Sequence, residues 1–556
     1  MRKWSFPPVM RVALVTVGAH LAACTPEDGP RTGTQTNWLR VCESDSDCGD
    51  LRCLCGACTR SCGDAIDCEA WEDASCLAAD EAGAVAFCAG SRPTSLGLCL
   101  LPCSTTPCPS GTSCVGGVCS PMLEPTAIVS VDEAQRYQSL VGIGAGMGYV
   151  FEEIVQHPRE AAVFDAMFAD FGITLLRLRN RYGQRDEEDL ESVSEIVAAA
   201  RERLGRSPTI ILNSTSPPGA LKENGSNWCE GDPDTCTLVR LPGGAFDYAG
   251  LAAHWRASLD AYAAVGVIPD YISLQNNPDW TPLAGQRTEA CRFLPTQGTT
   301  TVATDSGDLE VEYPGYAEAL AAVLDQLADL DSVPQVVAPD TTNLDVADYI
   351  AALDMADVDA IGHHLYGSDA DNLDTAALEA LHELGQQLDR PLFQTEMQAD
   401  AMTTAVLMHA SFVVEGASVY VQNGFVAAPS DTSPDGLIIL TADSYTISDP
   451  YHVIRQYSGY IKPDWVRVAA STDTESLLAS AWISPDEDVL VVVLTNPGTE
   501  RMTVQLEPDT TSAQSTTVTR TVLGEGIERF ADLGRLPAAG VVTLPGESIV
   551  TVKIER

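Results

Sequence analysis

The sequence predicts an α/β protein in which a (β/α)8 TIM barrel carries an appended antiparallel β-sandwich and follows a small disulfide-rich module. Eight short apolar runs alternate with helical patterns between about residues 126 and 462, as in a single barrel. After Pro463 the apolar residues recur with a period of two, which is typical of antiparallel strands. Fourteen of the 18 cysteines lie between Cys42 and Cys119, which indicates a disulfide framework.

Length and charge set the broad class of the protein. A chain of 556 residues with 45% hydrophobic content is long enough for a large core and about two to four domains. It has 32 Lys and Arg against 78 Asp and Glu, so its formal charge is −46. Such a field repels nucleic acid and anionic lipid, and we expect no nucleic-acid partner.

Residues 1–23 predict a signal peptide, because basic residues flank the short apolar segment 12–19. The run Leu21-Ala22-Ala23-Cys24 then resembles a bacterial lipobox, in which Cys24 becomes the lipidated first residue of the mature chain. Thr25 points, by the same resemblance, to the outer membrane. We therefore expect an exported lipoprotein of the bacterial cell envelope, held to the membrane through Cys24. An ordinary signal peptide with a chance cysteine is the alternative.

The cysteines favour disulfides over metal. Residues 24–41 read as a polar tether, and the module at 42–120 has too few large apolar residues to fold without crosslinks. Zinc is the alternative, because Cys55-x-x-Cys58 has the spacing of a metal site, but the module contains no His. Further along, Cys229 and Cys236 are close enough in sequence to close a small loop, which leaves Cys291 without an obvious partner.

The predicted barrel strands follow one another from residue 142 onward. The first lies in the glycine-rich run 142–148, which also hints at a nucleotide loop, but no Lys and no ribose-binding acid accompany it. Asp247 can cap a helix with one apolar face, formed by Leu251, Trp255, Leu259 and Tyr262. The other seven strand candidates are 173–178, 209–212, 268–274, 334–338, 358–363, 392–395 and 417–421.

Two of these strands end in polar motifs. The run 268–274 leads into Gln275-Asn276-Asn277-Pro278, and the run 392–395 leads into Glu396. A buried strand that delivers a carboxylate to its C-terminal end is how a barrel presents catalytic acids. Glu396 is therefore a candidate catalytic carboxylate, with a solvated charge or a structural ion pair as the alternative.

Several ordered motifs over about residues 125–556 resemble glycoside hydrolase family 30. They are Ser216-Pro217-Pro218 with Lys222-Glu223-Asn224-Gly225, Gln275-Asn276-Asn277-Pro278, His364-Leu365-Tyr366, Thr395-Glu396, and the segment 455–463. The resemblance implies a barrel at 126–462 whose opening strand, 127–138, packs with a sandwich at 463–556. It also implies retaining hydrolysis of a β-linked polysaccharide or oligosaccharide, such as xylan, a β-1,6-glucan or a galactan, with no cofactor and no metal.

Retaining hydrolysis uses two carboxyl groups about 5–5.5 Å apart, one as nucleophile and one as general acid and base. The resemblance implies that Glu396 is the nucleophile and that Arg177 and Tyr366 hold it ionised and aligned. It implies that Asn276 binds the sugar hydroxyl beside the reacting carbon. The remaining substrate-binding positions that it implies are Ser216, Trp280 and His364.

The position of the general acid and base is Asn277, where the family has Glu. A carboxamide has no proton to give near neutral pH and cannot take one from water. Either the substrate has a good leaving group, or a nearby residue moves in, or the site only binds sugar. The residues that could move in are His363, His364 and Asp279.

Aromatic residues that the family places around the sugar are also missing. Thr215, Ala220 and Gln422 stand at those positions, unless the divergent loops are shifted by a residue or two. We therefore expect a retaining glycoside hydrolase-like protein that is impaired by Asn277. The alternatives are a non-catalytic sugar-binding pseudoenzyme on the same fold, and an interaction protein that works through its Cys-rich module.

Overall fold

The computed structural model describes residues 38–40, 42, 48–55, 57–71, 73–78, 97–103, 108, 112–115, 117–121 and 125–556, the last range with gaps at 149, 185–187, 283–285, 305–306, 430–435, 508–512, 525–526 and 537–539. The predicted signal peptide at 1–23 and the predicted lipidation site Cys24 lie outside these residues. Within them, no helix is both long enough and apolar enough to span a membrane.

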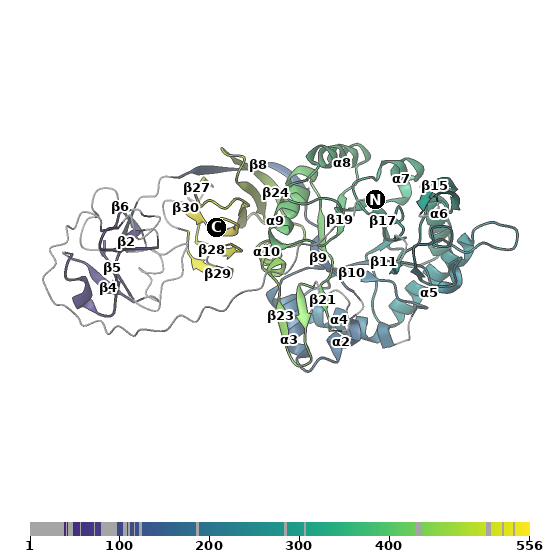
Figure 1. Cartoon of the computed structure of the whole chain (residues 1–556), viewed down its shortest axis with the longest axis horizontal. Coiled ribbons are helices and arrows are strands. Elements are labelled where there is room, and N and C mark those ends of the chain that lie inside the picture. The colour runs from purple at the N-terminus through teal and green to yellow at the C-terminus, as the bar shows by residue number, and fades with distance from the viewer. Residues whose placement is uncertain are drawn as a thin grey trace, which may run out of the picture.

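Eight parallel strands close into a barrel in which the last strand pairs with the first (Figure 1). Each predicted strand overlaps an observed one, so the (β/α)8 prediction is confirmed. The strands are β9 (Gly142–Gly146), β10 (Leu175–Arg179), β11 (Thr209–Asn213), β13 (Tyr271–Ser273), β17 (Gln335–Thr341), β18 (Ala360–His364), β19 (Leu392–Met397) and β20 (Val419–Gln422).

Helices surround the barrel on its outer side (Figure 1). Asp247 caps α5 as predicted, because its side chain accepts a hydrogen bond from the backbone N–H of Gly250 at 2.8 Å, and the four apolar residues predicted for this helix are buried. The α-helices are α2 (Phe151–Val155), α3 (Glu160–Phe164), α4 (Glu188–Leu204), α5 (Tyr248–Ala264), α6 (Tyr316–Leu327), α7 (Ala347–Ala352), α8 (Thr375–Leu388), α9 (Ala401–Ala410) and α10 (Asp449–Ser458).

The C-terminal region is one nine-stranded sheet that folds over on itself. Side chains from β27 and β30 share an apolar core with side chains from β26, β28 and β31, which makes the two layers of a sandwich. The strand before the barrel, β8, pairs with β24 and β27 inside this sheet. In sheet order the strands are β29 (Glu528–Gly534), β28 (Ser515–Val522), β31 (Ser548–Glu555), β26 (Val489–Asn496), β25 (Leu478–Ile483), β24 (Val466–Thr472), β8 (Ala127–Ser139), β27 (Met502–Glu507) and β30 (Val541–Leu544).

The N-terminal module consists of short strands held by disulfides, and Figure 1 places it beside the sandwich. Its strands are β1 (Arg52–Leu54), β2 (Ala57–Thr59), β3 (Ser61–Cys62), β4 (Ser75–Leu77), β5 (Gly97–Leu100), β6 (Thr112–Val115) and β7 (Val118–Pro121). The pairs between described cysteines of the module are Cys42–Cys53, Cys48–Cys58, Cys62–Cys76, Cys68–Cys99, Cys103–Cys114 and Cys108–Cys119. These pairs confirm a disulfide-rich module, because a bonded sulfur is not a thiolate ligand.

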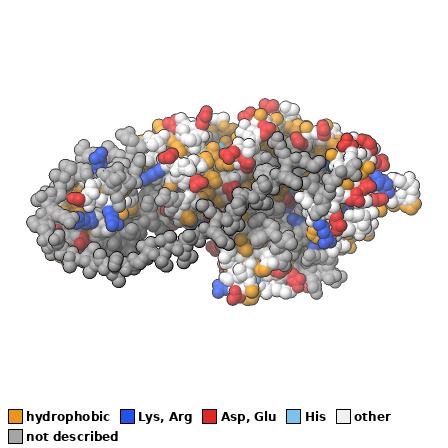
Figure 2. Space-filling model, viewed as in Figure 1, with side chains coloured by type: hydrophobic (Ala, Val, Ile, Leu, Met, Phe, Trp, Pro, Cys, Tyr) orange, Lys and Arg blue, Asp and Glu red, His pale blue; other side chains and the backbone are white. Residues whose placement is uncertain are grey.

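Three small sheets of the described barrel region do not correspond to any predicted strand, and one of them pairs β12 (Trp228–Cys229) with β14 (Thr288–Glu289). A hairpin of β15 (Gly298–Thr304) and β16 (Gly307–Tyr313) extends the loop after β13, and a three-stranded sheet, β21 (Val426–Ala427), β22 (Ile438–Leu440) and β23 (Tyr445–Ile447), follows β20. Acidic side chains spread over the face of the molecule in Figure 2, in keeping with the net charge of −46.

Candidate active site

The site is built on the alternation of side chains along β10. Leu175 belongs to an apolar cluster inside the barrel, and Arg177, two residues later, points to the same side. Arg177 therefore lies in the barrel interior beyond that cluster, toward the C-terminal ends of the strands, with only 3% of its surface exposed. A buried guanidinium requires anionic partners, and two carboxylates supply them.

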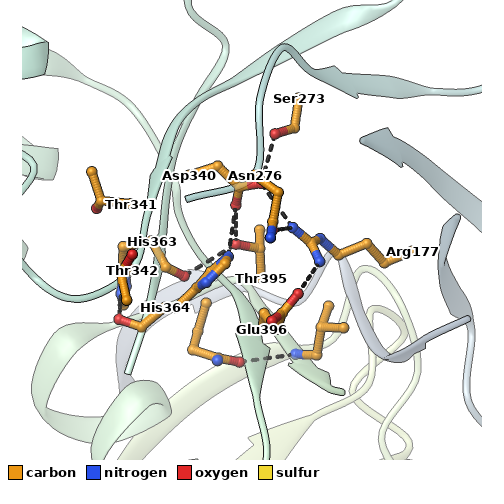
Figure 3. Close-up of polar contacts among 12 residues, drawn as sticks. Arg177, Ser273, Asn276, Asp340, Thr341, Thr342, His363, His364, Thr395 and Glu396 are labelled. Atoms are coloured by element: carbon orange, nitrogen blue, oxygen red, sulfur yellow. Dashed lines mark hydrogen bonds and ion pairs between the residues drawn. The ribbon is translucent and has the colours of Figure 1, made fainter. Parts of the chain in front are cut away.

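Arg177 joins Glu396 to Asp340 (Figure 3). Its Nη1 donates to Oε2 of Glu396 at 2.5 Å, and its Nη2 donates to Oδ2 of Asp340 at 2.8 Å. The same Nη2 donates to Oδ1 of Asn276 at 2.5 Å. One cation thus ties together β10, β17, β19 and the segment after β13, all at the C-terminal mouth of the barrel.

Glu396 is held as an oriented anion. Burial is the largest influence and would raise the pKa of Glu396, but the charge of Arg177, with smaller contributions from His364, Arg179 and the hydrogen bond from Tyr366, lowers this pKa below its ordinary value. The hydroxyl of Tyr366 donates to Oε1 at 2.8 Å, and Nδ2 of Asn423 donates to the same oxygen at 3.3 Å. An ionised carboxylate in fixed orientation at a barrel mouth is able to attack an electrophilic carbon.

Asp340 is the central residue that the sequence analysis missed. It is completely buried, Ser273 donates to its Oδ2 at 2.6 Å, and Thr395 donates to its Oδ1. Burial is the largest influence and would raise the pKa of Asp340, but Arg177, His364 and the hydrogen bond from Ser273 together lower it far below the ordinary range. The sequence signal for Asp340 is its place two residues after the predicted strand 334–338, because the C-terminal ends of barrel strands converge.

Asn277 lies at the same mouth, and its backbone N–H donates to the carbonyl of Asp340 at 3.0 Å. Its φ of 50° is in the left-handed region, which Asn tolerates better than most residues. Its side-chain Oδ1 is buried and has no hydrogen-bond partner among the described residues. No described acidic side chain is hydrogen-bonded to it, so the position offers an amide and no exchangeable acid.

The three residues predicted as possible replacements for the missing acid are engaged elsewhere. His363 is fully buried, with Nε2 at 2.7 Å from Oε1 of Glu415. His364 is also fully buried, with Nε2 at 3.3 Å from Oδ1 of Asp340. Oδ1 of Asp279 accepts from the backbone N–H of Thr342 at 2.9 Å and from its hydroxyl at 3.0 Å. His363 and Asp279 are thus held by other partners, and His364 lies within the site beside Asp340.

Two of the predicted substrate-binding residues occupy supporting positions. Ser216 is fully buried, its hydroxyl donates to the carbonyl of Ala290 at 3.3 Å, and it accepts from Nζ of Lys222 at 3.2 Å. Trp280 is partly exposed and packs against a small cluster that contains the Cys229–Cys236 disulfide.

The remaining sequence features fall around the same mouth. Cys291 is free and buried, and burial raises the pKa of its thiol to about 11. Gln422 is the last residue of β20, and Thr215 lies two residues after the end of β11, so two of the three positions at which the resemblance places aromatic residues lie near strand ends. Ala220 belongs to the short 3-10 helix Gly219–Leu221.

Solved structures with the same fold are glycoside hydrolases and an exported protein. A family 30 subfamily 8 xylanase from Clostridium acetobutylicum is 18% identical, with a TM-score of 0.58 over 77% of this chain and 99% of the xylanase. A conserved exported protein from Bacteroides fragilis is 14% identical, with a TM-score of 0.60 over 77% of this chain and 100% of that protein. An endo-β1,6-glucanase is 14% identical, with a TM-score of 0.55 over 78% of this chain and 96% of the glucanase.

No protein-family model matches this chain, and no curated protein matches its sequence. At the identities of the solved structures, the likeness establishes the fold. The chain therefore has the barrel-and-sandwich fold of family 30 glycoside hydrolases, as its motifs predicted.

Proposed function

We propose that this chain is a retaining glycoside hydrolase-like protein in which Glu396 is the nucleophile and Asn277 limits turnover. The observation that carries this proposal is the ionised Glu396 carboxylate, fixed by Arg177 and Tyr366 at the barrel mouth. The likeness to xylanases and to an endo-β1,6-glucanase supports a β-linked polysaccharide or oligosaccharide as substrate. Asn276, held by Arg177, is the proposed partner of the sugar hydroxyl beside the reacting carbon.

The proposed first step needs a proton that the site lacks. An oxygen of Glu396 attacks the anomeric carbon, and the bond from this carbon to the leaving oxygen breaks. That oxygen must gain a proton unless it is stable as an anion, and the amide of Asn277 supplies none. Loss of a positioned acid and base costs about 10²–10⁴-fold in rate, which is about 3–5 kcal/mol of barrier.

The second step, hydrolysis of the glycosyl ester, needs a group that accepts a proton. Water must lose a proton as it attacks the glycosyl ester on Glu396, and Asn277 accepts none. An anionic nucleophile such as azide needs no base. A substrate with a good leaving group should therefore transfer its glycosyl group to Glu396 quickly, whereas water should remove this group slowly. Azide should speed its removal.

Chromogenic aryl β-glycosides test both steps. We expect a burst of phenolate equal to the enzyme concentration, followed by a slow phase that azide accelerates. Glu396→Gln is the matched control, since it keeps the size of the side chain and removes the nucleophile. A steady rate with no burst, or a burst that persists in Glu396→Gln, contradicts the proposal.

Sugar binding without turnover is the second candidate function. Among the described residues, Oδ1 of Asn277 has no hydrogen-bond partner and no acid is hydrogen-bonded to this side chain, which favours this candidate. It predicts that glycans bind the full chain while aryl glycosides give neither a burst nor a response to azide. If no glycan binds, the remaining hypothesis is an interaction protein that works through the module at 42–120.

The proposed location is the bacterial cell envelope, with Cys24 as the lipid anchor, the module at 42–120 as a spacer, and the barrel and sandwich at 126–462 and 463–556 beyond it. The disulfides of the described module fit an exported protein, and so does the likeness to an exported protein. Expression with labelled palmitate should label the wild-type chain and leave Cys24→Ala unlabelled. Equal labelling of both chains contradicts the anchor.

A further inference from the structure

A cavity of about 600 Å³ lies beside the nucleophile, over the C-terminal ends of β19 and β20. Tyr366 and Asn423 line it, and both donate hydrogen bonds to Oε1 of Glu396. Because these two residues connect the cavity wall to Glu396, the cavity lies beside the site in which a glycosyl group would be attached. A sugar bound there lies next to the reacting carbon, so the chemistry of the cavity wall selects the substrate.

Gln422 gives this wall an unsatisfied hydrogen-bonding group. Only 2% of Gln422 is exposed, it lines the cavity, and its Oε1 has no hydrogen-bond partner among the described residues. Buried polar atoms in native proteins are nearly always paired, and a small turn of the Gln422 side chain would bring its unpaired oxygen to the cavity, where a ligand hydroxyl can complete the pair. A sugar hydroxyl both donates and accepts, and it satisfies either end of the amide.

The charge on the wall excludes anionic ligands. The described lining residues include no Lys or Arg, and they include the exposed carboxylate of Asp400. Asp400 is fixed in place because it caps α9, accepting from the backbone N–H of Thr403 at 3.0 Å and from its hydroxyl at 2.7 Å. A uronic or sulfated sugar in the cavity would face Asp400 and the ionised Glu396 with no cation from the wall, and the net charge of −46 adds to the repulsion.

The rest of the wall suits an uncharged ring. Leu437, Ile439 and Pro450 offer apolar surface to the C–H groups of a sugar. The only aromatic residue among the described lining residues is Tyr366, whose hydroxyl is committed to Glu396. Recognition therefore depends on hydrogen bonds to hydroxyl groups more than on stacking against an aromatic platform.

We propose that this cavity is a specificity pocket for a neutral sugar unit, with Gln422 as its hydrogen-bonding determinant and Asp400 as the group that rejects acidic sugars. The proposal rests on the proposed function, because it assigns the substrate class of the same site. The pocket would bind unsubstituted xylan, glucan or galactan chains in preference to chains that carry a uronic acid or a sulfate group on the sugar unit in the pocket.

Calorimetric titration of the full-length, oxidised chain tests the pocket directly. The probes are neutral xylo-, β-1,6-gluco- and galacto-oligosaccharides and, for each backbone that binds, the analogue with a uronic acid unit. We expect at least tenfold tighter binding of the neutral member of a pair. Gln422→Met, which keeps the size of the side chain, should weaken neutral binding about five- to tenfold by removing one hydrogen bond.

Two further variants separate charge from folding. Asp400→Asn keeps the helix cap and removes the charge, so it should reduce the discrimination between neutral and acidic sugars severalfold. Gln135→Met, on exposed sandwich strand β8, is the matched control for Gln422→Met and should bind like wild type.

The possible outcomes separate this inference from the proposed function. Equal binding of neutral and acidic sugars overturns the charge assignment while leaving the proposed function standing. Unchanged neutral binding in Gln422→Met overturns the role of Gln422. Failure of every glycan to bind overturns the proposed function, and the pocket assignment falls with it.

Discussion

Replacing Asn277 by Glu should restore hydrolysis of ordinary glycosides. The backbone at this position is fixed by the hydrogen bond from its N–H to the carbonyl of Asp340, and the side-chain Oδ1 has no hydrogen bond to any described residue that the substitution would remove. The substitution adds one methylene group and replaces the carboxamide by a carboxyl group, at a partly buried position at the barrel mouth. A carboxyl there supplies the proton for the leaving group and later accepts one from water.

The expected gain in rate is about 10²–10⁴-fold, the usual contribution of a positioned acid and base. The substitution also has a cost in stability. Asn277 has a φ of 50°, and a residue other than Gly, Asn or Asp in this conformation costs about 1–2 kcal/mol. We therefore expect a more active protein with a slightly lower free energy of unfolding.

Release of reducing sugar from an unactivated β-linked oligosaccharide measures the gain as kcat/KM. Asn277→Gln is the matched control, because Gln has the length of Glu and the same backbone strain but carries no proton to give. Both variants should show the same loss in urea midpoint, and only Asn277→Glu should gain activity. A folded Asn277→Glu protein that is no faster than Asn277→Gln would refute the reasoning.

Three further predictions follow from the buried charges and the loop disulfide. Arg177→Met leaves Asp340 and Glu396 without their cation, so the free energy of unfolding should fall by about 3–5 kcal/mol in urea titrations; a loss below 1 kcal/mol contradicts the assigned ion pairs. The folded-state pKa of Asp340 is depressed, so its contribution to stability is present above its unfolded pKa of about 4 and is lost as the pH falls below it. The stability difference between wild type and Asp340→Asn should accordingly be largest above about pH 5 and shrink below about pH 4, and a difference that grows on acidification contradicts the sign. Removing the Cys229–Cys236 disulfide with a double Ser substitution should lower stability by about 2.5 kcal/mol, judged from its sequence separation of 7, and an unchanged urea midpoint contradicts that role.

The barrel could be predicted because its signals are local. Each buried strand is a short apolar run, and the helix of Asp247 carries both its cap and its apolar face in a single stretch of sequence. The position of Glu396 could also be predicted from the sequence, because a carboxylate at the C-terminal end of a buried barrel strand lies at the barrel mouth.

The rest of the site depends on contacts that no local pattern records. Asp340 is central only because Arg177, Ser273 and Thr395 converge on it from three other strands. Ser216, a predicted substrate-binding position, is fully buried, and its hydroxyl donates to the carbonyl of Ala290, a contact that the sequence does not reveal. The polar hairpin of β15 and β16 has weak apolar periodicity, because most of its side chains are exposed or half-exposed.

Mass mapping of a trapped glycosyl-enzyme tests the central claim most directly. The protein is incubated with an aryl 2-deoxy-2-fluoro-β-glycoside of a sugar that it binds, then digested and sequenced by mass spectrometry. The account predicts one glycosyl group per chain, on the peptide that contains Glu396, and its release by azide as a β-glycosyl azide. A sugar attached elsewhere, an α-glycosyl azide product, or no adduct with a glycan-binding protein would contradict Glu396 as a nucleophile that works without an acid partner.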